Sequence, residues 1–136
     1  MNRYYTTGFD EGGKVLTAIG KTETKLVKDL LDRIPARYCL INSTWIGDDL
    51  PALQKFVDGT HCSEVILYSG PDWENQADIY HRQKGHQILQ HNFRKVWHIG
   101  NTNNGYYFLY WLEFIKDNWK YFDRAKYLVT PTLQRS

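Results

Sequence analysis

The sequence has few of the features that assign a chain to a specialised class. Its 136 residues include two cysteines, too few for a disulfide framework, and the formal net charge is only +2. So small a charge does not by itself indicate a nucleic acid or an anionic membrane as a partner. No apolar run approaches the roughly 20 residues that cross a bilayer, and the first residues lack the apolar core of a signal peptide. We therefore expect a soluble, cytoplasmic protein with reduced thiols and neither a membrane nor a nucleic acid as partner.

Complete motifs for known chemistry are also missing. Residues 20–22 read Gly-Lys-Thr, like the end of a phosphate-binding P-loop, but Val15 stands where that motif needs its first glycine. No nucleophile elbow, C-x-x-C or H-E-x-x-H pattern occurs. Three histidines are spaced by five residues, which does not align them on one helix face: His81, His86 and His91. The sequence identifies no cofactor and no metal site, and it does not decide whether the protein is an enzyme.

The sequence does contain enough apolar residues for one folded domain over residues 1–136. Short apolar runs alternate along the chain with amphipathic segments. The expected strands are residues 14–19, 38–42, 64–68 and 95–99, with the first dozen residues as loop or edge strand. The expected helices are residues 22–34, 50–59, 75–92 with a break near Gly85, and a last one from Asn103 or Asn104 to about Phe122. Thr22 or Thr24 is expected to cap the first helix, and Asp48 or Asp49 the second.

Apolar strands without alternation, separated by helices, are typical of a parallel sheet that is buried on both faces. Right-handed crossovers would then place helices on both sides of the sheet. We therefore predict an α/β fold, a small three-layer sandwich with three or four mainly parallel strands. Such a sheet is Rossmann-like or flavodoxin-like.

Polar loops follow the expected strands. The carboxyl ends of parallel strands share one edge, where ligands of open α/β sheets bind, so we expect these loops to converge there. The candidate ligand-binding residues are Trp45, Asp48, Asp72, Trp73, Asn101, Thr102, Asn103 and Asn104. Within this group Asp72 is also a weak catalytic candidate, together with His98 at the end of its strand.

The turn between Gly100 and Gly105 allows two interpretations. A polar turn that leads into a helix offers free backbone N–H groups, which bind phosphate or carboxylate. However, asparagine and glycine are also the usual residues of tight turns and helix caps, and this structural reading explains every residue of the turn. The acidic loop residues raise a similar choice between a Mg²⁺ site and ordinary capping, and capping is favoured for Asp48 and Asp49.

Aromatic residues make up 15% of the chain and gather in the last expected helix. One stripe of this helix, spaced by three, four and seven residues, suits the core. A second aromatic set lies outside the stripe and is predicted to form an interface: Tyr107, Tyr110, Phe114 and Tyr121. Either a second copy of the chain or the C-terminal residues 127–136 would cover it.

Two hypotheses of function follow. In the first, the domain binds an anionic ligand (a nucleotide, nucleotide-sugar or sugar phosphate) at the strand carboxyl edge. In the second, it is a non-catalytic interaction or assembly protein that uses the aromatic surface of its last helix, as a homo-oligomer or with a protein partner.

Overall fold

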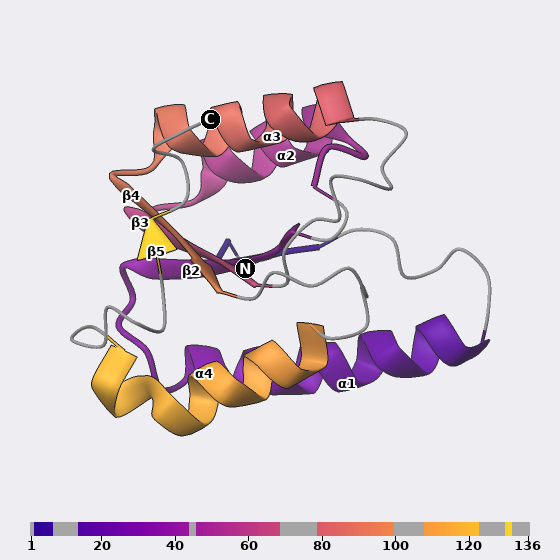
Figure 1. The fold of residues 1–136 in the computed structure, drawn as a ribbon, viewed down its shortest axis with the longest axis vertical. Coiled ribbons are helices and arrows are strands. Elements are labelled where there is room, and N and C mark those ends of the chain that lie inside the picture. The colour runs from indigo at the N-terminus through magenta and orange to yellow at the C-terminus, as the bar shows by residue number, and fades with distance from the viewer. Residues whose placement is uncertain are drawn as a thin grey trace.

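A computed structural model describes residues 2–6, 14–43, 46–68, 79–99, 108–122 and 130–131 (Figure 1). The strands are β1 (Tyr4–Tyr5), β2 (Tyr38–Asn42), β3 (Glu64–Tyr68), β4 (Lys95–Ile99) and β5 (Thr130–Pro131). The helices are α1 (Lys14–Leu31), α2 (Leu50–Gly59), α3 (Ile79–Asn92) and α4 (Phe108–Phe122). Within these described ranges, no helix is both long enough and apolar enough to cross a membrane.

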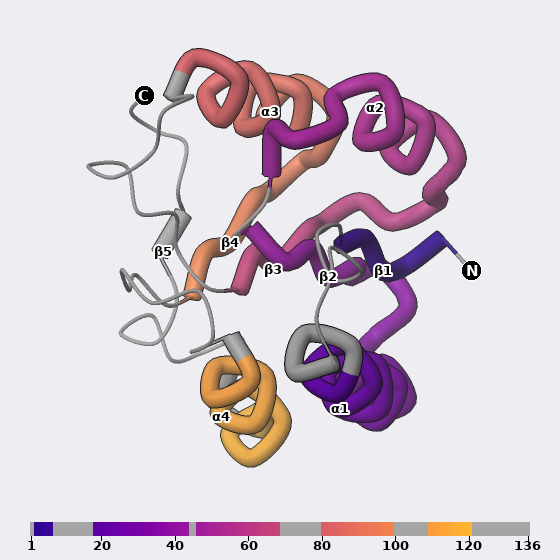
Figure 2. Tube along the Cα trace, turned by 90° about the vertical axis from the view of Figure 1, so that its right-hand side faces the viewer, coloured from indigo at the N-terminus to yellow at the C-terminus, as the bar shows by residue number. Residues whose placement is uncertain are grey.

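The strands form one sheet in the order β1-β2-β3-β4-β5 (Figure 2). The first four are parallel, with Cys39 opposite Val65 and Val65 opposite Val96. The two-residue β5 is antiparallel to β4. The predicted α/β fold with mainly parallel strands is thus confirmed.

Two layers of helices enclose the sheet, α1 and α4 on one face and α2 and α3 on the other (Figure 1). Every residue of β2 and β3 is buried, as the absence of alternation predicted. Tyr38, Leu40 and Ile66 face α1 and α4, whereas the neighbouring residues of the same strands face α2 and α3. Successive residues along each strand therefore belong alternately to two separate apolar cores.

The handedness of the connections differs from the expectation. Since β1, β2 and β3 are adjacent and parallel in chain order, right-handed crossovers would put α1 and α2 on the same face. The two helices lie on opposite faces, so the β1–α1–β2 and β2–α2–β3 connections have opposite hands. The strand order also does not reverse within the described strands, unlike that of a flavodoxin-like or Rossmann sheet.

The predicted strand at residues 14–19 is wrong, because these residues form the first turns of α1. Val15, Ile19 and Glu23 are spaced by four and continue the stripe of the later helix, which is a helical rather than a strand pattern. Thr22 and Thr24 are consequently not caps. Their hydroxyls donate to the carbonyls one turn back, at 3.2 and 2.9 Å.

Helix α3 is not broken near Gly85, which is buried in an unbroken helix. A Cβ at Gly85 would lie 3.0 Å from Cγ1 of Ile46, so this glycine allows the loop after β2 to pack closely against α3. Asp49 caps α2 as predicted, accepting from the Ala52 N–H at 3.0 Å. The last helix is described from Phe108, and its predicted start at Asn103 or Asn104 lies outside the described residues.

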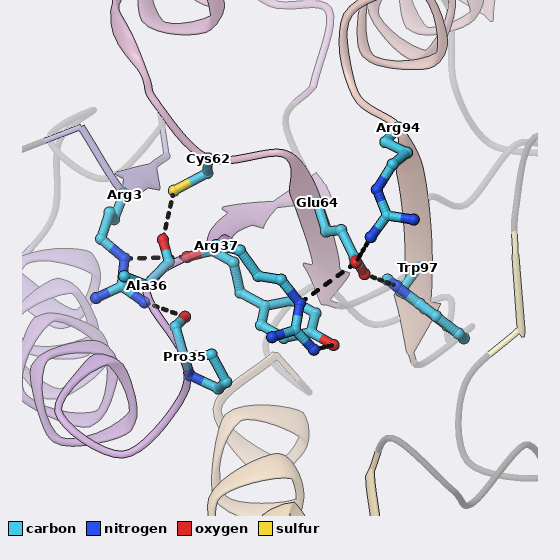
Figure 3. Close-up of polar contacts among 9 residues, drawn as sticks. Arg3, Pro35, Ala36, Arg37, Cys62, Glu64, Arg94 and Trp97 are labelled. Carbon is cyan, nitrogen blue, oxygen red and sulfur yellow. Dashed lines mark hydrogen bonds and ion pairs between the residues drawn. The ribbon is translucent and has the colours of Figure 1, made fainter.

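An ionic cluster fixes the amino edge of the sheet (Figure 3). The buried Glu64 carboxylate pairs with Arg94 and, at 3.4 Å, with Arg37. The Trp97 indole N–H donates to the other oxygen of Glu64 at 2.9 Å. Both carboxylate oxygens are therefore satisfied, as burial of a charge requires.

Candidate functional site

The carboxyl ends of β2 and β3 carry polar side chains that are fully buried. Asn42 and Tyr68 end the two strands as paired residues, and Ser43 follows directly. These three side chains are at most 1% exposed. The Ser43 hydroxyl donates to the Tyr68 carbonyl at 3.3 Å, which ties the two strand ends together.

Glu23 of α1 lies against these strand ends and is 0% exposed. Its Oε2 accepts from the Asn42 amide at 2.9 Å and from the Tyr68 hydroxyl. The Tyr4 hydroxyl is close enough to interact electrostatically with this carboxyl but does not reach hydrogen-bond geometry. Oε1 has no hydrogen-bond partner among the described residues. The carboxyl cluster (Tyr4, Glu23, Asn42 and Tyr68) thus has spare capacity for one more polar contact.

Burial raises the pKa of Glu23, although the hydrogen bonds from Tyr68 and Asn42 oppose the shift. Burial and then the neighbouring Glu23 charge raise the pKa of Tyr4 and of Tyr68. The cluster consequently disfavours negative charge. A protonated Glu23 would be a hydrogen-bond donor, unlike a carboxylate.

A second polar group lies on the other face of the sheet, towards α3. Arg82 is 5% exposed, and its Nη1 donates to the Ser43 carbonyl at 3.1 Å. The buried His86 ring lies 6.5 Å from the His98 ring of β4. Burial, then the charges of His98 and Arg82, lowers the pKa of His86 to about 3. His86 is therefore neutral at physiological pH, beside a permanent cation.

Gly47 brings the loop after β2 onto α3. Its φ is 101°, in the left-handed region that glycine adopts readily. A Cβ there would lie 2.8 Å from the backbone carbonyl atoms of His81, so only glycine fits this approach. The contact holds the Ser43 carbonyl against Arg82 and shapes the carboxyl edge between β2 and α3.

The predicted site residues are only partly within the described ranges. His98 lies beside His86. Asp48 is exposed in the loop before α2. Burial, and then the charges of Asp49 and Asp48, raise the pKa of Tyr5 to about 12. The other candidate ligand-binding residues lie outside the described residues: Trp45, Asp72, Trp73, Asn101, Thr102, Asn103 and Asn104.

Several residues of the site were missed from the sequence, among them Glu23, Tyr68 and Arg82. A signal for Glu23 was present, because it lies four and seven residues before Val27 and Leu30 and so on the apolar stripe of α1. A carboxyl at such a position is buried when the helix docks. No comparable signal marks Arg82.

Of the predicted interface residues, Tyr110 and Phe114 have described side chains. Tyr110 is 56% exposed and contacts Trp111 and Phe114, with ring centroids 4.9 and 6.1 Å away. Phe114 is half-buried and packs against the core between α1, α4 and the sheet. Tyr107 and the side chain of Tyr121 lie outside the described residues.

Comparison with protein-family models, curated proteins and solved structures finds no match for this chain.

Proposed function

We propose that the protein binds a small anionic ligand (a nucleotide, nucleotide-sugar or sugar phosphate) at the carboxyl edge of its sheet, between β3 and β4. The observation that carries the proposal is the position of the helices. Helix α3 follows β3 on one face, and α4 follows β4 on the other. In open α/β sheets, ligands bind outside the carboxyl ends of the strands, where neighbouring connections leave towards opposite faces. Here the connections after β3 and β4 diverge in this way without a reversal of strand order.

The chemistry around this point suits an anion. Arg82 supplies a buried permanent cation, and His86 beside it is held neutral. On the other face, burial raises the pKa of Glu23, so the surroundings of this carboxyl disfavour its negatively charged form. The connections after β3 and β4 contain the asparagines expected to bind the ligand and one tryptophan, Trp73, expected to stack on it. We assign Asn101 and Asn103 to the anion and Trp73 to stacking.

A thermal-shift screen tests the proposal. A ligand at ten times its dissociation constant stabilises the folded state by about 1.4 kcal/mol, which raises the Tm of a domain of this size by several degrees. We expect such a rise with at least one member of a panel of nucleotides, nucleotide-sugars and sugar phosphates at millimolar concentration. The double variant Asn101→Ala/Asn103→Ala should lose most of it.

Asn92→Ala is the matched control, since this exposed asparagine lies at the far end of α3, near the amino edge. It should keep the full ligand-induced rise. No rise with any compound, or an equal rise in the double variant, would show that the carboxyl edge is not an anion site.

A second candidate function is protein interaction through α4. The observation that favours it is Tyr110, which remains exposed although its ring contacts Trp111 and Phe114. Tyrosine is enriched at protein interfaces, where the ring is buried while the hydroxyl stays wet. The test of this candidate is the mass of the assembly in solution.

A further inference from the structure

The two cysteines of the chain meet on the α2 and α3 side of the sheet. Cys39 is the second residue of β2 and is 0% exposed, whereas Cys62 precedes β3 and is partly exposed. Both belong to the same apolar core, and their thiols interact as hydrogen-bond partners. Only Cys62 is open to a reagent in solution.

The backbone and a fixed cation surround the Cys62 sulfur. As a thiol, Cys62 donates to the Ala36 carbonyl at 3.4 Å (Figure 3). The Arg3 guanidinium donates to the Tyr38 and Pro35 carbonyls at 3.0 and 2.9 Å, on the same turn. The positive charge of Arg3, held in place by these carbonyls, acts to lower the pKa of both thiols.

These contacts shift the pKa values of the two thiols in opposite directions. Hydrogen bonding from Cys39, then from Thr60, together with the Arg3 charge, lowers the pKa of Cys62 to about 6, although burial opposes the shift. The same hydrogen bond and burial raise the pKa of Cys39. The exposed Cys62 is therefore the more acidic of the two thiols and the better nucleophile, while the buried Cys39 holds its proton more tightly.

We propose that Cys62 and Cys39 form a redox-active dithiol, in which the exposed Cys62 reacts with a small-molecule disulfide and the buried Cys39 resolves the product. The pairing does not depend on the ligand site, which lies at the opposite edge of the sheet.

The exchange proceeds in two balanced steps. The Cys62 thiolate attacks one sulfur of the disulfide R–S–S–R, forming a mixed disulfide and releasing RS⁻. Cys39 then gives up its proton to solvent and attacks the Cys62 sulfur, which releases the second RS⁻. The chain loses two electrons and two protons, and the disulfide is reduced to two thiols. The resulting Cys39–Cys62 bond closes the loop that contains α2.

Oxidised glutathione serves as the probe, with intact-mass spectrometry as the readout. Wild-type protein should lose about 2 Da and retain no glutathione, as expected for an internal disulfide. Cys39→Ala should instead accumulate one glutathione per chain, because the resolving thiol is absent. Cys62→Ala should keep its original mass, with neither an internal disulfide nor a bound glutathione, since Cys39 is buried.

The pH dependence of alkylation by iodoacetamide provides a second measurement. Cys39→Ser keeps a hydroxyl donor beside Cys62. In this variant, the pH at which alkylation reaches half its maximal rate should lie well below 9.0, the ordinary pKa of cysteine. The proposal is overturned if wild-type protein retains glutathione as a stable adduct, or if Cys39→Ala and Cys39→Ser take up neither reagent while far-ultraviolet circular dichroism shows that both are folded.

Discussion

At the scale of single residues, Glu23 is the side chain whose surroundings control its charge most directly. It is fully buried and accepts from Asn42 and Tyr68. Burial raises its pKa in the folded state above that in the unfolded chain. The folded state therefore binds this proton more tightly, and the stabilisation is complete below the unfolded pKa and is lost as pH rises through the folded pKa.

Glu23→Gln tests this linkage. Glutamine keeps an oxygen that accepts from Asn42 or Tyr68 but does not titrate. We expect the free energy of unfolding of the variant to exceed that of the wild type near pH 8. The difference should vanish near pH 3, well below the ordinary pKa of 4.5, where Glu23 is protonated in both states. Urea unfolding at the two pH values measures it, and a constant difference would contradict the raised pKa.

Glu23→Ala is the control for the hydrogen bonds rather than for the charge. It leaves the Asn42 amide and the Tyr68 hydroxyl buried without this acceptor, at about 1 to 3 kcal/mol for each unsatisfied group. The loss should appear at both pH values. A variant as stable as Glu23→Gln near pH 8 would show that water replaces the carboxyl.

At the scale of elements, two glycines with different surroundings lie at the two ends of helix α2. Gly47 precedes it with a φ of 101° and a would-be Cβ contact of 2.8 Å to backbone atoms of α3. Gly59 ends it, and the nearest atom to a Cβ there is 3.7 Å away in the flexible Asn2 side chain. A methyl group is therefore excluded at the first position and accommodated at the second.

Gly47→Ala should lower the free energy of unfolding by more than about 2 kcal/mol, because it adds backbone strain to a steric clash. Gly59→Ala should change it little or raise it by up to about 1 kcal/mol, since alanine restricts the unfolded chain and favours the helix. Guanidinium unfolding distinguishes the two. Equal, small effects would mean that the loop moves away from α3.

The sequence predicted the central elements correctly because their signals are local. Residues 38–42, 64–68 and 95–99 are apolar runs with turn residues around them, and residues 50–59 contain a cap, a proline in the first turn and one apolar face. Residues 14–19 were mistaken for a strand because a short apolar run fits both periods. Only the rest of the stripe, through Leu26 and Leu30, resolves that ambiguity.

The site was less predictable, because its contacts join distant parts of the chain. The pair of Glu23 and Tyr68, and that of Arg82 and Ser43, each require two elements to dock in one register. The same is true of the two cysteines, whose proximity depends on β2 and β3 being neighbours. Composition and spacing determine neither the register between two elements nor the face of the sheet on which a helix packs.

At the scale of the whole molecule, the exposed aromatic residues concern assembly. Tyr110 on α4 and Tyr80 on α3 are 56% and 62% exposed, on opposite sides of the sheet. If α4 forms a symmetric interface, light scattering at micromolar concentration should give about twice the chain mass of 16.1 kDa. Tyr110→Ser should then raise the dissociation constant by at least about tenfold, as for an interface hot spot.

Tyr80→Ser is the matched control and should leave the mass unchanged. Phe114 is unsuitable as a probe, since it packs against the core and its replacement would also destabilise the chain. A wild-type protein that stays at the mass of one chain rules out the α4 interface between copies.

The strand order has a consequence for how the protein is made. Each strand is paired with the one that precedes it in the chain, from β1 to β5. A ribosome releases the amino-terminal residues first, and each new strand then finds its neighbour already at the open edge of the sheet. Among the described strands, none has to be inserted between two others that were synthesised earlier. The sheet formed by the described strands can therefore grow vectorially during translation, one β–α unit at a time.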